Sequence, residues 1–236
     1  MRRGLLGILI ACFVVATFAW GPTILGLQPS PLPGSTADPT ADPTASPSPS
    51  RTVDATPLAF FSSDGYTVTL PPGWTASAVG RAQQGILLEL LRGSNADLAD
   101  LVGEILDLSG GEVSMVGGDL GALSHGGVPP NVSVLIEPNG GQSGDVLMAA
   151  TEQLIRRIPG QTGNVARTRV TLGGLPAERF EYSVRLSTGL DQVRLETYTF
   201  ARGSSTYLIT CASSVERFPE QQAMFDGIVK SFHLVD

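Results

Sequence analysis

Polar and apolar residues first alternate with the period of a β-strand in the segment that ends at Trp74. Tyr66, Val68 and Leu70 are separated by two threonines, which indicates a strand with one buried face. The preceding Ser63-Asp64-Gly65 predicts a hairpin turn, because Asp-Gly accepts the positive φ of a tight turn. Trp74 follows this strand and is expected to close one edge of the core.

Apolar residues then recur at helical spacing, which predicts two adjacent helices over residues 78–91 and 94–108 with a glycine break between them. A helical hairpin over residues 78–108 can cover one end of a sheet. It can also present an apolar groove beside the sheet, and the sequence leaves both interpretations open.

Two further helices are predicted nearer the C-terminus. One covers residues 143–158, where Ser143 is placed to cap the first turn. The residues expected on its buried side are Val146, Leu147, Ala150, Leu154, Ile155 and Ile158. The other covers residues 219–229, after which Phe232 and Leu234 are expected to return to the sheet.

The remaining alternating segments predict an antiparallel sheet. The expected strands cover residues 112–115, 131–137, 165–172, 177–186, 192–201 and 206–213. Gly173-Gly174 and residues 202–205 predict tight turns between neighbouring strands. Charges of both signs on the polar faces indicate one solvated side of the sheet, and Cys211 is expected to be a buried small apolar residue.

The Gly-rich stretch over residues 117–130 is the most irregular part of this region, and loops of this kind often carry function. Its candidate residues are Asp119, His125, Gly126 and Gly127. A flexible connector is the other interpretation, because no Ser, Cys or metal-ligand spacing accompanies the histidine. Nucleophile-elbow, phosphate-loop, dinucleotide-binding and Cys-x-x-Cys motifs are absent from the sequence, so we expect no catalytic residue, cofactor or metal ligand.

The N-terminus predicts a membrane or export signal over residues 1–27. Met1-Arg2-Arg3 precedes an uncharged apolar run over residues 4–27, which as a helix would span about 36 Å against a hydrocarbon core of about 30 Å. Three fates are open: a retained signal anchor, cleavage after Ala19, or lipidation of Cys12, whose preceding residues resemble a bacterial lipoprotein box. All three deliver the rest of the chain outside the cytoplasm, because the arginines stay inside.

Residues 28–56 are rich in Pro, Ser, Thr and Ala and predict a disordered linker. At full polyproline II extension this linker would reach about 90 Å. It can serve as a stalk across a cell wall or as a spacer whose length hardly matters. Residues 57–236 are then expected to form one domain with 12 basic and 19 acidic residues, a balance that argues against nucleic acid and anionic lipid as partners.

Three motifs of this domain resemble the PsbP-like fold family. They are the opening F-S-S-D-G-Y-T-V-T-L-P-P-G-W, the strand G-L-P-A-E-R-F-E-Y and the closing F-D-G-I-V-K-S-F. The resemblance implies an α+β fold, an antiparallel β-sheet with helices packed on both faces, in a secreted or membrane-anchored protein. It also implies a non-enzymatic binding or assembly module. The segments 78–108 and 117–130 depart from the family pattern, and no family ligand residue is matched.

The sequence therefore favours a membrane-tethered extracytoplasmic module that recognises an envelope protein without catalysis. The alternative is a carrier or sensor of an apolar small molecule or lipid, held in a groove beside the 78–108 hairpin. A hydrolase-type enzyme is a further alternative, and it would require His125 and Asp119 to converge with a third polar group in one cleft.

Overall fold

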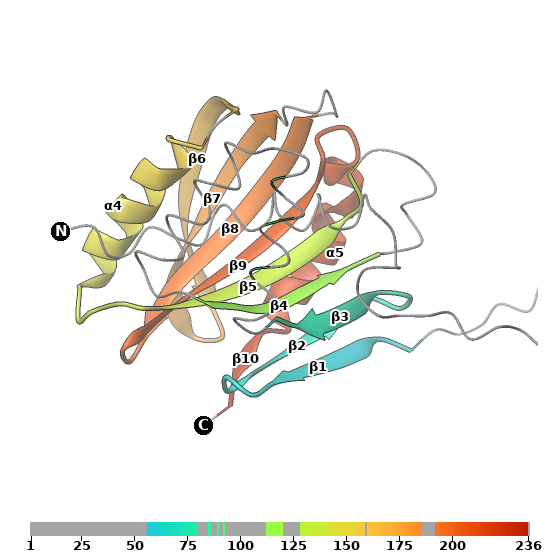
Figure 1. The fold of residues 1–236 in the computed structure, drawn as a ribbon, viewed down its shortest axis with the longest axis horizontal. Coiled ribbons are helices and arrows are strands. Elements are labelled where there is room, and N and C mark those ends of the chain that lie inside the picture. Colours follow the sequence, from blue (N-terminus) through green and yellow to red (C-terminus); the bar gives the residue numbers. More distant parts are fainter. Residues whose placement is uncertain are drawn as a thin grey trace, which may run out of the picture.

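The described part of the chain is built on two antiparallel sheets (Figure 1). The computed structural model describes residues 56–79, 112–119, 128–158, 160–185 and 192–235, together with Gly85, Glu89 and Arg92. Within them, a seven-stranded sheet has the order β3-β4-β5-β9-β8-β7-β6 and a three-stranded sheet has the order β1-β2-β10. The strands are β1 (Leu58–Ser62), β2 (Tyr66–Leu70), β3 (Thr75–Ala78), β4 (Glu112–Gly118), β5 (Asn131–Pro138), β6 (Gln161–Leu172), β7 (Leu175–Arg185), β8 (Gln192–Arg202), β9 (Ser205–Ser214) and β10 (His233–Leu234). The helices are α4 (Gly144–Ile155) and α5 (Phe218–Lys230).

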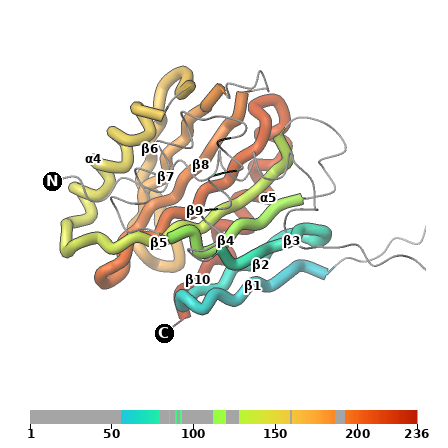
Figure 2. Tube along the Cα trace, in the orientation of Figure 1, coloured from blue at the N-terminus to red at the C-terminus, as the bar shows by residue number. Residues whose placement is uncertain are grey.

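The first hairpin is confirmed. β1 pairs with β2 around a turn in which Gly65 has a φ of 80°, and Tyr66, Val68 and Leu70 are all buried. The hairpin belongs to the small sheet, whose third strand, β10, comes from the far end of the chain and pairs with β2 (Figures 1 and 2). The expected return of Leu234 to a sheet is thus also confirmed.

Two boundaries near this hairpin differ from the prediction. Residues 75–78 form β3 and pair with β4, so Ala78 is the end of a strand and not the start of a helix. Gly117 and Gly118 belong to β4 and not to the Gly-rich loop. A Cβ atom on Gly117 would lie 2.9 Å from Leu70 Cδ1, so this glycine lets the core leucine pack against β4.

A bulge in β4 ties the first hairpin to the main sheet. The register with β5 shifts between Val113 and Met115. The hydroxyl of the intervening Ser114 accepts a hydrogen bond from the Tyr66 hydroxyl (2.8 Å) and donates one to the Asp64 carboxylate. Burial raises the pKa of Tyr66 to about 12, because its phenolate would lie in the core.

The meander from β6 to β9 follows the predicted order, and the Gly173-Gly174 turn sets its register. Leu172 pairs with Leu175, so Arg169 lies opposite Glu178. β9 is buried along nearly its whole length, because both faces of the sheet centre are covered. The predicted solvated side is therefore restricted to the outer strands β6 and β7.

α5 covers one face of the main sheet and joins it to the small sheet. The cluster of buried residues on this face includes Phe225, Ile228 and Val229 from the helix. Phe232 follows the helix and stacks on Tyr66, with ring centroids 5.0 Å apart. The same ring lies 5.7 Å from Phe200 and 6.2 Å from Tyr207 of the main sheet, and Cys211 is buried in this cluster as predicted.

α4 lies against the opposite face, over β6, β7 and β8 (Figure 1). Helices therefore lie on both faces, as the fold class predicts. Val146 was expected on the buried side and is exposed, while Met148 is buried in its place, because the helix is rotated relative to the predicted stripe. Ser143 occupies the N-cap position, but its side chain makes no capping hydrogen bond.

The described residues exclude the signal segment 1–27, the linker 28–56 except Thr56, and nearly all of the 78–108 hairpin. Among the helices that are described, none has the length and apolar character needed to cross a bilayer.

Candidate functional site

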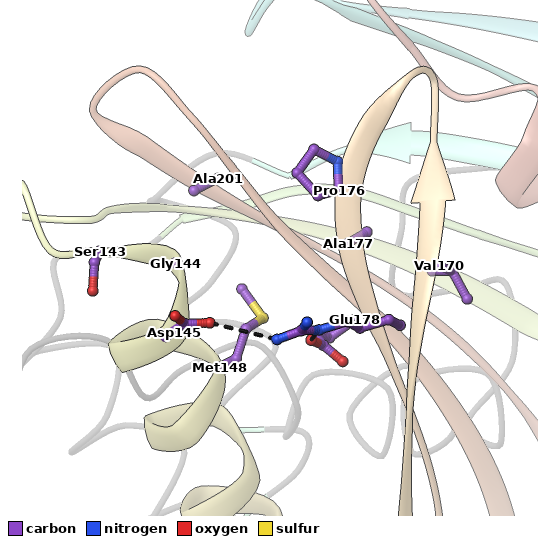
Figure 3. Close-up of a pocket in the computed structure, with 10 residues that line it drawn as sticks. Ser143, Gly144, Asp145, Met148, Val170, Pro176, Ala177, Glu178 and Ala201 are labelled. Atoms are coloured by element: carbon purple, nitrogen blue, oxygen red, sulfur yellow. Dashed lines mark hydrogen bonds and ion pairs between the residues drawn. The ribbon is translucent and has the colours of Figure 1, made fainter.

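A cleft of about 490 Å³ lies between the start of α4 and the β6–β7 hairpin. We call it the α4 cleft. Its lining residues are Ser143, Gly144, Asp145, Met148, Arg169, Val170, Pro176, Ala177, Glu178 and Ala201. Met148 reaches from the helix into the space beside β7 (Figure 3), and Asp145 forms an ion pair with the Arg169 guanidinium. A hollow of this volume is in the usual range for small-ligand and side-chain pockets.

The buried carboxylate of the α4 cleft is Glu178, whose side chain is only 8% exposed. Arg167 donates to both of its oxygens, from Nε (3.3 Å) and from its terminal nitrogen (3.4 Å). Arg169 Nε donates to Oε1 (3.1 Å). Burial acts to raise the pKa of Glu178, but the two guanidinium groups outweigh it and hold that pKa below its ordinary value. The carboxylate is therefore ionised at neutral pH.

Arg167 is itself held in place from two sides. Its guanidinium contacts Glu152 of α4 at 3.4 Å and lies 5.8 Å from the centre of the Phe180 ring. Glu152 also pairs with Arg156 at 2.8 Å, and the hydrogen bond from Arg156 is the main reason that the pKa of Glu152 is lowered. This chain of ion pairs fixes the orientation of the fork that Arg167 presents to Glu178.

Two buried threonines lie beside the cleft on the same face of the sheet. Thr199 is the cross-strand neighbour of Glu178, and Thr206 is the cross-strand neighbour of Ala201. Both hydroxyl oxygens are buried and have no hydrogen-bond partner among the described residues. Buried hydroxyls without partners are unfavourable, so both threonine hydroxyls remain available to form a hydrogen bond next to the cleft.

A second polar cluster lies on the opposite face, under α5. Glu196 is 1% exposed, and its Oε2 accepts hydrogen bonds from the Tyr198 hydroxyl and from Gln222 Nε2, both at 3.1 Å. Burial raises the pKa of Glu196 above its ordinary value, because both of these donors are neutral. Burial also raises the pKa of Cys211, which lies opposite Glu196 in the register. Glu196 and Cys211 are both buried, so this cluster is a part of the core.

The predicted functional loop is described only at its ends. Asp119 is half-buried after β4, and its backbone N–H donates to the Pro130 carbonyl (3.2 Å). His125, Gly126 and Gly127 lie outside the described residues, as does Cys12. The convergence of Asp119 with His125 thus stays a prediction. Across the described ranges, no group of acidic, histidine or cysteine side chains has the arrangement of a metal site.

The charged residues of the α4 cleft were not predicted from the sequence as a site. A signal for them exists, because a two-residue turn at Gly173-Gly174 places residues at equal distances from it opposite each other. This rule alone puts Arg169 across from Glu178, and cross-strand pairs of opposite charge stabilise a sheet. The contribution of Asp145 depends on the position of α4 and has no comparable signal in the sequence.

Several solved structures are similar to this chain, among them the three that follow. Cyanobacterial PsbP (CyanoP) from Synechocystis sp. PCC 6803 is 16% identical with a TM-score of 0.48, and the match covers 82% of this chain and 99% of that one. LpqN, involved in cell envelope biogenesis of Mycobacterium tuberculosis, is 11% identical with a TM-score of 0.44, covering 79% and 88%. The Saccharomyces cerevisiae Ran-binding protein Mog1p is 12% identical with a TM-score of 0.42, covering 78% and 97%.

A PsbP protein is thus among the solved structures similar to this chain, and the sequence motifs resemble the same family. No protein-family model and no curated protein sequence matches the chain.

Proposed function

We propose that residues 57–236 form a non-catalytic binding domain that contacts an envelope protein through the α4 cleft. The observation that carries the proposal is the cleft itself, about 490 Å³ in volume and bordered by a buried carboxylate whose position is fixed by Arg167. A pre-organised site of this kind lowers the conformational cost of binding.

The surrounding sequence supports display outside the cytoplasm. An apolar segment over residues 4–27 would anchor the chain, and a proline-rich linker over residues 28–56 would hold the domain at a distance. Such an arrangement suits a module that must reach a partner in the envelope. The acidic domain, with 12 basic and 19 acidic residues, fits a partner that presents positive charge.

Site-specific photocross-linking in the native membrane tests this proposal. The full-length chain carries p-benzoylphenylalanine in place of Pro176, which is exposed at the rim of the α4 cleft. A partner bound in the cleft gives a discrete cross-linked species that disappears on adding Ala201→Trp, because the indole fills the cleft. The control carries the same photoreactive residue at Glu220, which is exposed at the start of α5.

A cross-linked species that persists in the Ala201→Trp variant, or that forms equally from position 220, contradicts binding through the cleft. The folding of each variant is checked by its circular dichroism spectrum and melting temperature before the comparison is made.

A further inference from the structure

The mouth of the α4 cleft is occupied by a cation of the protein itself. Arg169 extends between two carboxylates: its Nε lies 3.1 Å from Glu178 Oε1 and a terminal nitrogen lies 3.9 Å from Asp145 Oδ1. The Arg169 side chain is nevertheless 81% exposed. Exposed ion pairs contribute little to stability, so this guanidinium can leave its position at low cost.

If Arg169 moved away from the mouth, the Glu178 carboxylate would keep its position. Arg167 still donates to both oxygens of Glu178 and remains anchored by Glu152. Oε1 of Glu178 and the Asp145 carboxylate would then face the open cleft without their exposed partner. With Arg169 gone, the two carboxylates at the mouth would attract a positively charged group.

The rest of the lining suits a long side chain with a charged end. Met148 is buried and Ala201 is half-buried on this face of the sheet, and Pro176 lies at the rim. A lysine or arginine side chain places its methylene stem along such an apolar surface and keeps its charged group at the polar end. An anion would instead meet Asp145, which is in the first turn of α4 at the same mouth.

We infer that the α4 cleft receives a lysine or arginine side chain of a partner protein, which replaces Arg169 between Asp145 and Glu178. This inference rests on the proposed function and names the chemical group that the cleft recognises. Arg169 acts as an internal competitor that closes the site when no partner is bound.

Methyl NMR of the full-length chain tests the inference. The chain has four methionines, and the signal of Met148 is assigned by its loss in Met148→Leu. The probes are three peptides, acetyl-Ala-Lys-Ala-amide and its norleucine and glutamate counterparts, which differ only in one side chain: positively charged, uncharged or negatively charged. We expect the lysine peptide to shift the Met148 methyl with a Kd of about 1 mM, and we expect the other two to leave it unchanged.

Single substitutions identify the groups responsible. Arg169→Ala removes the competitor and is expected to tighten lysine-peptide binding by up to about fivefold. Asp145→Asn should weaken binding by a few-fold, and Glu178→Gln by about tenfold. The matched control is Glu220→Gln, which removes the same charge from the first turn of α5 and is expected to leave binding unchanged.

The possible results separate the inference from the proposed function. A Met148 shift with the norleucine or glutamate peptide alone shows that the cleft binds a ligand of another class, and it overturns only the inference. Weaker lysine-peptide binding in Arg169→Ala overturns the competitor role. No shift with any peptide overturns the inference, and the cross-link from position 176 then decides the proposed function independently.

Discussion

Removal of the Phe232 side chain should strongly destabilise this fold. This side chain is 2% exposed and packs against one ring of the small sheet and two rings of the main sheet. Replacing a buried phenylalanine by alanine costs about 3–5 kcal/mol, and aromatic pairs add about 0.5–1.5 kcal/mol each beyond their buried area. We therefore expect Phe232→Ala to fall in the upper half of that range, near 4–5 kcal/mol.

Thermal unfolding followed by circular dichroism measures this loss. In a domain of this size, 1 kcal/mol changes the melting temperature by about 2–4 °C, so Phe232→Ala should lower it by roughly 8–20 °C. Phe61→Ala is the matched control, because Phe61 is a phenylalanine of the same small sheet that is 75% exposed. Its substitution should change the free energy of unfolding by no more than about 0.5 kcal/mol.

Hydrogen exchange decides whether the two sheets unfold together. If Phe232→Ala leaves the melting temperature unchanged while only the amides of β2 and β10 exchange faster, the small sheet opens independently of the main one. That result would refute the conclusion that this aromatic cluster couples the sheets. An equal loss of stability in Phe61→Ala would refute the use of burial to rank the two residues.

Three further predictions test other parts of the structure. Burial raises the pKa of Glu196, so its contribution to stability is fully present below its ordinary pKa and is lost as pH rises through the raised value. Glu196→Gln should lessen this fall in urea titrations at increasing pH, and an unchanged profile contradicts the assignment. Gly117→Ala should lower the free energy of unfolding by about 1–3 kcal/mol, because the new Cβ clashes with Leu70. The control is Gly227→Ala in α5, whose Cβ would meet nothing within 4 Å and which should stabilise the fold by about 0.5–1 kcal/mol. A similar loss of stability in both variants would point to a general effect of glycine replacement. Ser114→Ala should lower the free energy of unfolding by about 1–3 kcal/mol, because it leaves the buried Tyr66 hydroxyl unpaired. The loss should be clearly smaller in a Tyr66→Phe background, which has no such hydroxyl. Additive losses of stability in the double variant would exclude the hydrogen bond between Tyr66 and Ser114.

Most of the strands could be predicted from local sequence pattern. Alternation located β2 and the strands from β6 to β9, and the glycine turn at residues 173–174 fixed the register of β6 with β7. β3 was missed because Thr75–Ala78 lacks large alternating side chains, and its pairing with β4 supplies what its own sequence does not. The rotation of α4, which exposes Val146, also depends on tertiary packing.

The candidate site shows the same division. The pairing of Arg169 with Glu178 follows from the register that the Gly173-Gly174 turn sets, whereas the approach of Asp145 depends on where α4 packs against the sheet. A cleft between a helix and a sheet edge has no signature in either segment alone. The functional prediction fell on the Gly-rich loop because an irregular stretch can be recognised in the sequence alone. A site formed between a helix and a strand cannot be recognised in this way.

The pairing of β10 with β2 has a consequence for how the protein is made. The ribosome delivers β2 early, but its neighbour β10 and the ring of Phe232 follow only after β9 and α5. Tyr66 therefore stays uncovered in the nascent chain until Phe232 has been synthesised. A stop codon at position 232 should yield a product whose small sheet never closes over Tyr66 and which is degraded.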